Sequence, residues 1–349
     1  MKNEKIKQLI ERLAKNHTLD FDEYVFLCEN GEIELEYASA LAEKIRQEVY
    51  GRDVYIRGLI EVSNYCKNDC LYCGIRRSNR DCERYRLDKD TILSCCDTGY
   101  ALGFRTFVLQ GGEDSRFTDE FVSDVVYAIK EKYPDSAVTL SLGERSYESY
   151  KTLFEAGANR YLLRHETADS EHYARLHPSS LTLDNRIKCL NDLREIGYQV
   201  GCGFMVGSPY QTSENLAKDL AFIEKFRPDM CGIGPFIAHH ATPFASFASG
   251  TLEKTLLMLA LVRMIHPKVL LPATTALGTI DDRGREKGIL AGANVIMPNL
   301  SPADHKEKYM IYDNKLSSGA EAAENKKDLE RRMIDIGYKI VTARGDVKR

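Results

Sequence analysis

Hydrophobic and polar positions alternate with two different periods along most of this chain. From Val54 onward, short runs rich in β-branched and aromatic residues are followed by longer charged segments with apolar residues at helical spacing. This alternation is typical of repeated βα units around a parallel sheet. We therefore expect an α/β fold.

The number of such runs decides between architectures. Eight runs have strand character: 54–62, 104–110, 137–142, 159–164, 198–206, 229–236, 268–274 and 293–298. Several intervening segments end in glycine, as at Gly157, Gly197 and Gly292, where a left-handed residue can stop a helix. Eight strands with intervening helices predict a complete (β/α)8 TIM-type barrel, with a doubly wound open sheet as the alternative.

The two ends of the chain have a different pattern. Residues 1–50 carry apolar residues at helical spacing and predict a helical extension that caps the lower barrel or flanks it. Residues 51–300 form the predicted barrel. Residues 301–349 are polar, with one helical stretch, and predict a helical C-terminal tail or cap. No Gly/Ser linker separates these parts, so we expect a single domain over residues 1–349.

Composition and charge exclude two classes of partner. Lys plus Arg number 48 against 52 for Asp plus Glu, a net charge of -4, which leaves no basic excess for binding nucleic acid phosphates. The first residues mix charges into a helical pattern, and no run reaches the roughly 18 apolar residues of a membrane span. We expect a cytoplasmic protein with neither a nucleic acid nor a membrane partner.

Active sites of (β/α)8 barrels lie on loops after the carboxyl ends of the strands. Chemically active residues follow the predicted strands in this way. They are Cys66, Cys70 and Cys73 after the first strand, Gly111 to Glu113 after the second, Glu144 after the third, His165 and Glu166 after the fourth, Pro235 to His240 after the sixth, Thr274 and Thr275 after the seventh, and Asn299 after the eighth.

The chain has ten cysteines, which in a reducing compartment are thiols or metal ligands rather than disulfides. Seven are scattered and are interpreted as small buried apolar residues: Cys28, Cys82, Cys95, Cys96, Cys189, Cys202 and Cys231. The other three lie in CKNDCLYC, residues 66–73. Three thiolates at this spacing can hold an iron–sulfur cluster and leave one iron open. A zinc knuckle completed by a distant cysteine or histidine, such as Cys82, is the alternative.

The C-x3-C-x2-C spacing, with Tyr72 before the last cysteine and a barrel strand before the loop, resembles the motif of the radical S-adenosylmethionine (SAM) superfamily. The resemblance implies one 4Fe-4S cluster on Cys66, Cys70 and Cys73. Its open iron would bind SAM, and an electron would cleave the cofactor to methionine and a 5′-deoxyadenosyl radical.

The same resemblance implies a set of SAM contacts. Glu113 would receive the methionine amino group, Glu166 would bind the ribose or the amino acid part, and Arg186 would pair with the carboxylate. Met205 would pack on the adenine, although a core role is equally expected. The full set of implied cofactor contacts is Tyr72, Gln110, Gly111, Gly112, Glu113, Ser141, Arg164, Glu166, Arg186 and Met205.

Longer segments, among them VLQGGED, RYLLRHETA, GIGPFIAHHATP and PATTALGT, resemble the HydE family of FeFe-hydrogenase maturases. That resemblance implies a small cysteine-bound iron carbonyl cyanide substrate supplied by HydG, a HydF scaffold, and an electron donor such as ferredoxin or flavodoxin. Implied substrate contacts are Thr139, Thr274, Thr275 and Tyr309. His239 and His240 are interpreted as a solvated loop pair rather than as ligands.

Other functions stay open at this point. Methylornithine synthase shares the cluster motif and the GED ending of the second-strand loop. Biotin-synthase-like sulfur insertion lacks an evident second set of ligands, and a non-catalytic iron–sulfur scaffold would cleave no SAM. No cysteine follows Cys231, so we expect one cluster only. Gly111 stands where some HydE relatives have a hydroxyl residue, which puts one hydrogen bond in doubt.

Overall fold

The computed structural model describes residues 2–316 and 325–348. Its strands are β1 (Asp53–Ile56), β2 (Gly58–Ser63), β3 (Thr106–Gly111), β4 (Ala137–Ser141), β5 (Arg160–Leu162), β6 (Gln199–Cys202), β7 (Met205–Val206), β8 (Met230–Cys231), β9 (Gly234–Pro235), β10 (Val295–Ile296) and β11 (Lys339–Val341).

Helices separate most of these strands. They are α1 (Lys2–Asn16), α2 (Phe21–Asn30), the 3-10 helix η1 (Gly31–Glu34), α3 (Leu35–Tyr50), α4 (Lys89–Ala101), α5 (Asp119–Lys132), α6 (Tyr147–Glu155), α7 (Ser170–Leu176), α8 (Leu183–Ile196), α9 (Ser213–Phe226), α10 (Leu252–Ile265), α11 (Thr275–Ile280), α12 (Gly284–Leu290), α13 (Ala303–Lys306) and α14 (Lys326–Asp335). The hydroxyls of Thr118, Ser146 and Thr182 accept the N–H three residues later, so local sequence encodes the starts of α5, α6 and α8.

Six strands form one parallel sheet in the order β2-β3-β4-β5-β6-β8. The order of the first five follows the chain, as expected for βα units in a TIM-type barrel. A separate parallel sheet has the order β10-β1-β11. Isolated parallel bridges connect the two sheets, from Met230 to Leu270, from Pro272 to Val295 and from Leu59 to Asn299. The described residues thus resemble a TIM-type barrel, but their strands do not close into one continuous ladder.

Several expected strand boundaries were wrong. The runs 54–62, 198–206 and 229–236 each divide into two strands, and 268–274 forms no strand beyond the isolated bridges. Pro272 has no N–H to donate to a ladder, which limits pairing in that run. At Gly203 the backbone has a φ of 151°, and a Cβ there would lie 2.0 Å from the Gly232 carbonyl oxygen. This close approach separates β6 from β7.

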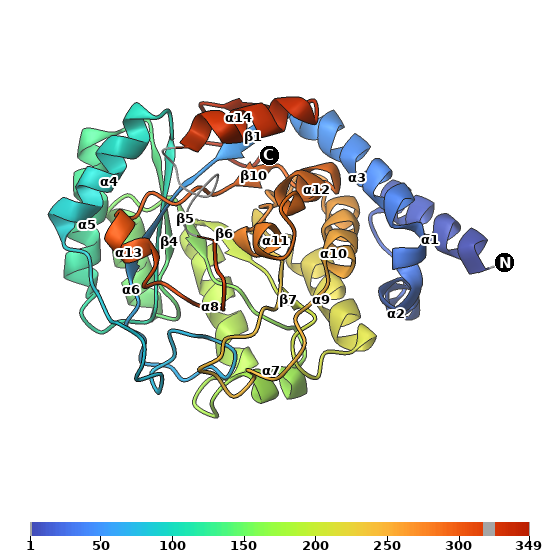
Figure 1. Cartoon of the computed structure of the whole chain (residues 1–349), viewed down its shortest axis with the longest axis horizontal. Coiled ribbons are helices and arrows are strands. Elements are labelled where there is room, and N and C mark those ends of the chain that lie inside the picture. Colours follow the sequence, from blue (N-terminus) through green and yellow to red (C-terminus); the bar gives the residue numbers. More distant parts are fainter. Residues whose placement is uncertain (1, 317–324, 349) are drawn as a thin grey trace.

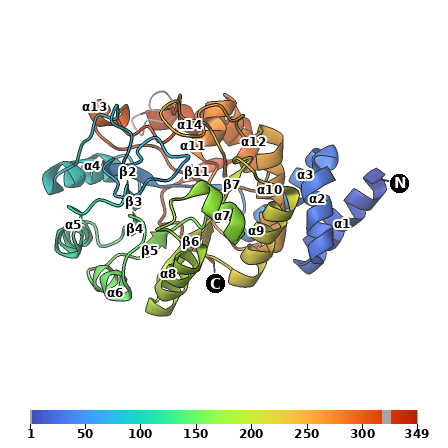
Figure 2. The same cartoon turned by 90° about the horizontal axis from the view of Figure 1, so that it is seen from below.

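The N-terminal extension flanks the barrel on its outer side. Figures 1 and 2 show α1, α2 and α3 beside α9 and α10, at the far side of the molecule from α4, α5 and α6. Every residue of α10 from Thr255 through Ile265 is buried. A helix that is apolar on all sides must be covered on both faces. The extension therefore supplies the outer cover of α10.

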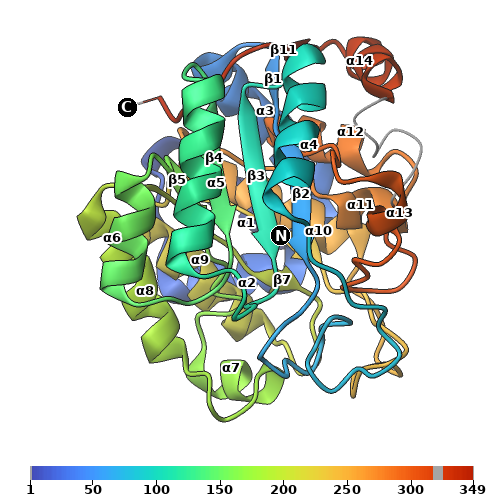
Figure 3. The same cartoon turned by 90° about the vertical axis from the view of Figure 1, so that its left-hand side faces the viewer.

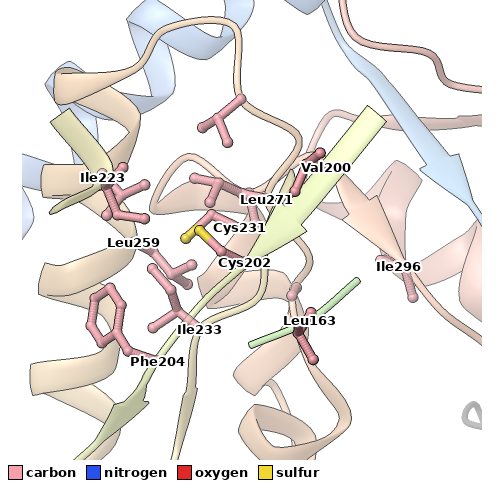
Figure 4. Packing of buried hydrophobic residues seen from close by; sticks show 14 of the residues in the cluster. Leu163, Val200, Cys202, Phe204, Ile223, Cys231, Ile233, Leu259, Leu271 and Ile296 are labelled. Atoms are coloured by element: carbon pink, nitrogen blue, oxygen red, sulfur yellow. The ribbon is translucent and has the colours of Figure 1, made fainter. Parts of the chain in front are cut away.

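The scattered cysteines belong to the packed interior. Cys202 and Cys231 are register partners in β6 and β8, and Figure 4 shows their sulfur atoms side by side near Ile223, Ile233 and Leu259. Of the seven scattered cysteines, only Cys82 is not fully buried. The prediction of small buried apolar residues is confirmed for the other six.

The C-terminal tail was expected to be helical, but it also contains β11, which pairs in parallel with β1. In Figure 3, β1 and β11 lie at one end of the molecule, and the long loop after β2 lies at the other end with α7. Among residues 2–316 and 325–348, no helix has the length and apolarity needed to cross a membrane.

Candidate active site

The three clustered cysteines lie on the loop after β2, and each is partly buried. Burial raises the pKa of the Cys70 thiol well above its ordinary value, and the neighbouring Cys73 and Cys66 raise it further. Burial, followed by Cys66, raises the pKa of Cys73 to about 12. A bound cation would favour the thiolate form of these cysteines.

The three cysteines differ from the one compact group of metal-ligand side chains among the described residues, which is His239, His240 and Asp313, with ligand atoms all within 4.8 Å of one another. A loop with three cysteines fits a 4Fe-4S cluster that keeps one iron open, whereas a structural zinc ion is closed by four protein ligands.

Two glycines allow the cysteine loop to pack closely against its surroundings. A Cβ at Gly112 would lie 2.2 Å from the Tyr65 carbonyl oxygen and 2.8 Å from the Cβ of Cys66. A Cβ at Gly74 would lie 2.2 Å from the Met310 carbonyl oxygen and 2.3 Å from the ring of His239. Gly112 thus holds the end of β3 against the loop that carries the cysteines.

Glu113 follows Gly112, and both of its carboxylate oxygens have partners. Its Oε1 accepts the Glu144 N–H at 3.1 Å, and its Oε2 lies 3.0 Å from the Lys67 ammonium. Its carbonyl accepts the Lys67 N–H at 2.9 Å. The carboxylate therefore lies beside the cysteine loop and binds an ammonium group there.

Arg164, Glu166, Arg186 and Glu144 form a charged group next to Cys70. The Glu166 carboxylate lies 3.1 Å from an Arg164 guanidinium nitrogen, and Arg186 Nε donates to Glu144 at 2.6 Å. Arg186 also donates to the Arg164 carbonyl. Burial opposes the charge of Arg186, but Tyr173 and Glu144 more than offset it, so its pKa is raised. Arg186 and Glu166 act in opposite directions on the pKa of Cys70, which places both near that thiol.

Glu166 has an unusual backbone conformation, with a φ of 66°. Its N–H donates to the Gly203 carbonyl at 3.0 Å, and its own carbonyl accepts the Met205 N–H at 3.2 Å. Non-glycine residues rarely hold this conformation unless their surroundings fix it, and such residues are concentrated at functional sites.

Tyr72 is supported by residues that the sequence did not single out. Its hydroxyl lies 3.2 Å from His177 Nε2, and His177 Nδ1 donates to the Tyr173 carbonyl at 2.9 Å. The Tyr173 and His177 rings stack with their centroids 3.9 Å apart. Burial, with Arg186, lowers the pKa of His177 to about 3, so the ring is neutral. The hydroxyl of Tyr72 therefore donates to Nε2.

Met205 is buried in a small apolar cluster with Leu176, Phe236 and Phe244, against which Leu71 and Tyr72 also pack. It lies beside the cysteine loop. Both roles expected for it, in the core and against a cofactor, are compatible with this place.

Gln110, Ser141 and Thr139 lie on the inner face of the sheet. Gln110 on β3 pairs with Glu61 on β2 and with Ser141 on β4. Thr139, two residues before Ser141 on β4, pairs with Arg160 on β5. Paired residues in adjacent strands face the same side. Thr139 is buried, and no hydrogen-bond partner is found for its hydroxyl among the described residues.

Arg57 is an interior residue that the sequence analysis missed. It lies between β1 and β2, and its Nη1 lies 2.9 Å from the Met230 sulfur. Its Nε and Nη2 have no hydrogen-bond partner within the described chain. Burial, followed by the charge of Arg160, lowers its pKa well below the usual range, and the Asp346 carboxylate opposes this shift. Arg57 precedes β2 and Arg160 begins β5, so these charges lie at the amino ends of the strands.

Thr274 and Thr275 stand at the start of α11. The Thr275 hydroxyl accepts from Arg285 at 3.3 Å, whereas no partner is found for the Thr274 hydroxyl within the described residues. Tyr309 belongs to the tail and is buried, with its ring 5.3 Å from the Lys315 ammonium. Lys315 pairs with Glu61 on β2, so Tyr309 lies near the interior of the sheet.

We expected both His239 and His240 to be solvated, but only His240 is. The His239 side chain is 6% exposed and the His240 side chain 73%. His240 donates to Asp313 through its backbone at 2.8 Å, and its Nδ1 lies 2.7 Å from the same carboxylate. The Nδ1 of His239 accepts the Ala241 N–H at 3.1 Å, so the proton of the neutral ring lies on Nε2. This proton disfavours metal binding and favours a hydrogen-bonded cluster.

Comparisons with known proteins agree with this geometry. The family model of the radical SAM superfamily matches residues 60–223. The [FeFe] hydrogenase maturase subunit HydE of Thermotoga maritima is 46% identical over 276 residues, which cover 79% of this chain and 78% of that protein. The chain belongs to the HydE family of radical SAM enzymes.

One further relative and two solved structures also match most of the length of this HydE-family chain. The 3-methylornithine synthase of Methanosarcina acetivorans is 29% identical over 90% of the chain and 89% of that protein. A solved methylornithine synthase superposes with a TM-score of 0.83 at 26% identity, covering 95% of this chain and 97% of that one. HydG from Carboxydothermus hydrogenoformans, at 19% identity and a TM-score of 0.81, shares the fold over 97% of this chain and 80% of its own.

Proposed function

We propose that this chain acts in assembly of the two-iron part of the FeFe-hydrogenase H-cluster. It would direct a 5′-deoxyadenosyl radical at sulfur in a small cysteine-bound iron carbonyl cyanide unit. In this proposal HydG supplies the unit, HydF serves as scaffold, and a ferredoxin or flavodoxin supplies electrons. The observation that carries the proposal is the 46% identity to a HydE maturase over 276 residues, which cover 79% of the chain. We also propose that residues 1–349 form one domain, with the barrel at 51–300.

Cys66, Cys70 and Cys73 are proposed as three ligands of one 4Fe-4S cluster with an open iron. When bound, the reduced cluster and SAM supply the 5′-deoxyadenosyl radical. The place of the three cysteines on one loop after β2, and the effect of Cys73 and Cys66 on the pKa of Cys70, support this assignment. Gly112 and Gly74 hold the loop in place from two sides.

The residues around Cys70 are proposed as the SAM site. Glu113 already binds an ammonium group, that of Lys67, and would bind the amino group of SAM at the same oxygen. Arg186 keeps its charge while buried, so its guanidinium can pair with a carboxylate, as Glu144 demonstrates. Glu166 lies between Arg164 and Gly203 and would accept from the ribose. Tyr72, Gln110, Gly111, Gly112, Ser141, Arg164 and Met205 complete the proposed set.

The barrel interior is proposed as the substrate chamber. The hydroxyls of Thr139 and Thr274 and two nitrogens of Arg57 are buried without a hydrogen-bond partner among the described residues. Buried polar groups are normally satisfied, so these groups indicate where a polar ligand binds. Donors and a guanidinium suit the cyanide and carboxylate groups of the proposed substrate. Thr275 and Tyr309 would contribute from α11 and from the tail.

A second candidate is lysine isomerisation, as in 3-methylornithine synthase, because that relative matches the chain over nearly its full length. The two functions are separated by incubating the cluster-loaded protein with SAM and reductant, and with either lysine or the cysteine-bound iron carbonyl cyanide complex. We expect 5′-deoxyadenosine formation to rise only with the iron complex, and methylornithine to be absent. Methylornithine formation from lysine would contradict the proposal.

A further inference from the structure

The segment after α13 crosses the mouth of the barrel next to the cysteine loop. We call residues 308–315 the strap. The Gly74 N–H donates to the Ile311 carbonyl at 2.9 Å, and the Asp313 N–H donates to the Ala238 carbonyl at 3.1 Å. The Asn64 side chain donates to the Lys308 carbonyl at 2.8 Å. The strap therefore bridges the loop after β2 and the loop after β9.

Lys315, at the end of the strap, enters the barrel. Its ammonium lies 2.6 Å from Oε1 of Glu61 on β2, and the two side chains are 5% and 0% exposed. The other carboxylate oxygen, Oε2, accepts from the Asn299 side chain at 2.9 Å. The strap is thus joined to the strands by a buried ion pair as well as by its surface hydrogen bonds.

This ion pair adjoins the proposed SAM site. Glu61 is the register partner of Gln110 on β3, and Gln110 belongs to the proposed SAM contacts. The Tyr309 ring packs against the Lys315 ammonium. Tyr309 and Lys315 therefore lie over the carboxyl ends of β2 and β3, above the inner face of the sheet.

Burying an ion pair costs desolvation free energy. Apolar side chains of similar size would attach the segment with equal or greater stability. Its charges, however, are both readily hydrated once the segment leaves. Burial raises the pKa of Glu61, while Lys315 and Asn299 oppose that rise, so the carboxylate depends on the docked strap. An attachment of this kind suits a segment that must close firmly and still open.

We propose that Lys315 is a positioning residue that latches the strap to Glu61 and closes the barrel mouth. The closed strap keeps solvent and external reductant away from the radical formed beneath it. This inference rests on the radical SAM activity of the family and not on the identity of the substrate.

The test uses the full-length protein with its cluster reconstituted anaerobically. The variants are Lys315→Met, Lys315→Arg and the double variant Lys315→Met with Glu61→Gln, and the control is Lys327→Met, an exposed lysine of the same tail. Three quantities are measured: the iron content, the hydrogen exchange of amides in the strap, and the 5′-deoxyadenosine formed with SAM and dithionite in the absence of substrate.

We expect Lys315→Met and the double variant to keep their cluster but to exchange strap amides roughly tenfold faster or more. Both should also form several-fold more 5′-deoxyadenosine without substrate. Lys315→Arg should stay close to the wild type, because it keeps the charge. If Lys315 only neutralised Glu61, the neutral double variant would behave as the wild type in both measurements, and that result would overturn the inference. If Lys315→Met loses its cluster and the double variant does not, the latch is tested by comparing strap exchange and 5′-deoxyadenosine formation between the double variant and Lys315→Arg.

Discussion

Gly112 and Cys66 are in direct contact, and only a glycine fits at position 112. A Cβ there would lie 2.8 Å from the Cβ of Cys66 and 2.2 Å from the carbonyl oxygen of Tyr65. The second-strand loop is thus a wall for the cysteine loop as well as a proposed SAM contact. The two loops cannot move independently.

This contact predicts that Gly112→Ala displaces Cys66. Overpacking of a tight site costs about 1–3 kcal/mol, and here the neighbour that must move carries a cluster ligand. We expect a lower iron content per chain after reconstitution and a proportional loss of SAM cleavage. Gly232→Ala is the matched control, since its Cβ would meet its nearest neighbour at 3.8 Å, an ordinary contact distance. Full iron loading of Gly112→Ala would refute this reading.

Arg57 should determine affinity for an anionic substrate without affecting SAM. Its unpaired nitrogens are buried, and a hydrogen bond to a charged group contributes about 1.5–3 kcal/mol. We expect Arg57→Met to raise KM for the cysteine-bound iron carbonyl cyanide complex by roughly tenfold or more, with substrate-free SAM cleavage unchanged. Arg52→Met, which alters an exposed arginine nearby, should leave KM unaltered. Equal KM values for Arg57→Met and Arg52→Met would show that Arg57 does not bind the substrate.

His266 predicts a loss of stability in mild acid. Burial, assisted by Arg227 and Arg263, lowers its pKa to about 4 from 6.5. Between these values the unfolded chain binds a proton that the folded chain does not, so unfolding becomes easier as the pH falls. The free energy of unfolding should decrease by up to about 1.4 kcal/mol per pH unit from this histidine. Denaturant titrations at pH 4.5 to 7 give the free energy of unfolding at each pH. This free energy should fall less steeply with decreasing pH in His266→Gln than in the wild type, and an equally steep fall would disprove the assignment.

The end of the tail should stabilise the lower barrel through Arg160. This fully buried guanidinium lies 2.6 Å from Asp346 and 3.0 Å from the Thr106 hydroxyl. Removing one partner of a buried charge costs about 3–5 kcal/mol, and we expect the lower end because Asp346 is partly exposed. Asp346→Ala should therefore lower the free energy of unfolding by about 3 kcal/mol.

Asp328 supplies the control for this measurement, since its ion pair with Arg331 lies at the surface. Asp328→Ala should cost less than about 1 kcal/mol. Equal losses for the two aspartates would show that the tail does not hold the barrel through Arg160.

The sequence predicted the βα order and the place of the cysteine loop, because both depend on local patterns. Periodicity locates strands, and the spacing of Cys66, Cys70 and Cys73 lies within one loop. It did not predict β11, because a short strand in a polar tail is defined only by its pairing with β1. Arg57 and Lys315 were missed for a similar reason, since a charged residue shows no sign of burial until its partners are in place.

The same limit applies to the segment VLQGGED. Its glycines and Glu113 were singled out, but Asp114 was not. The Asp114 carboxylate accepts from Ser63 at 2.6 Å and from Arg86 at 2.6 Å and 3.0 Å, which ties the loop to β2. These partners are distant in sequence, so their contribution appears only in the fold.

The most direct test of the proposed function is cell-free maturation of FeFe-hydrogenase, measured as hydrogen evolution. The mixture contains HydG, HydF and the apo-hydrogenase, and the cluster-loaded protein is first omitted and then restored. We predict little activity without the protein, recovery when the wild type is added, and no recovery with Cys70→Ala. Full maturation without the protein, or no recovery with fully loaded wild type, would contradict its role in H-cluster assembly.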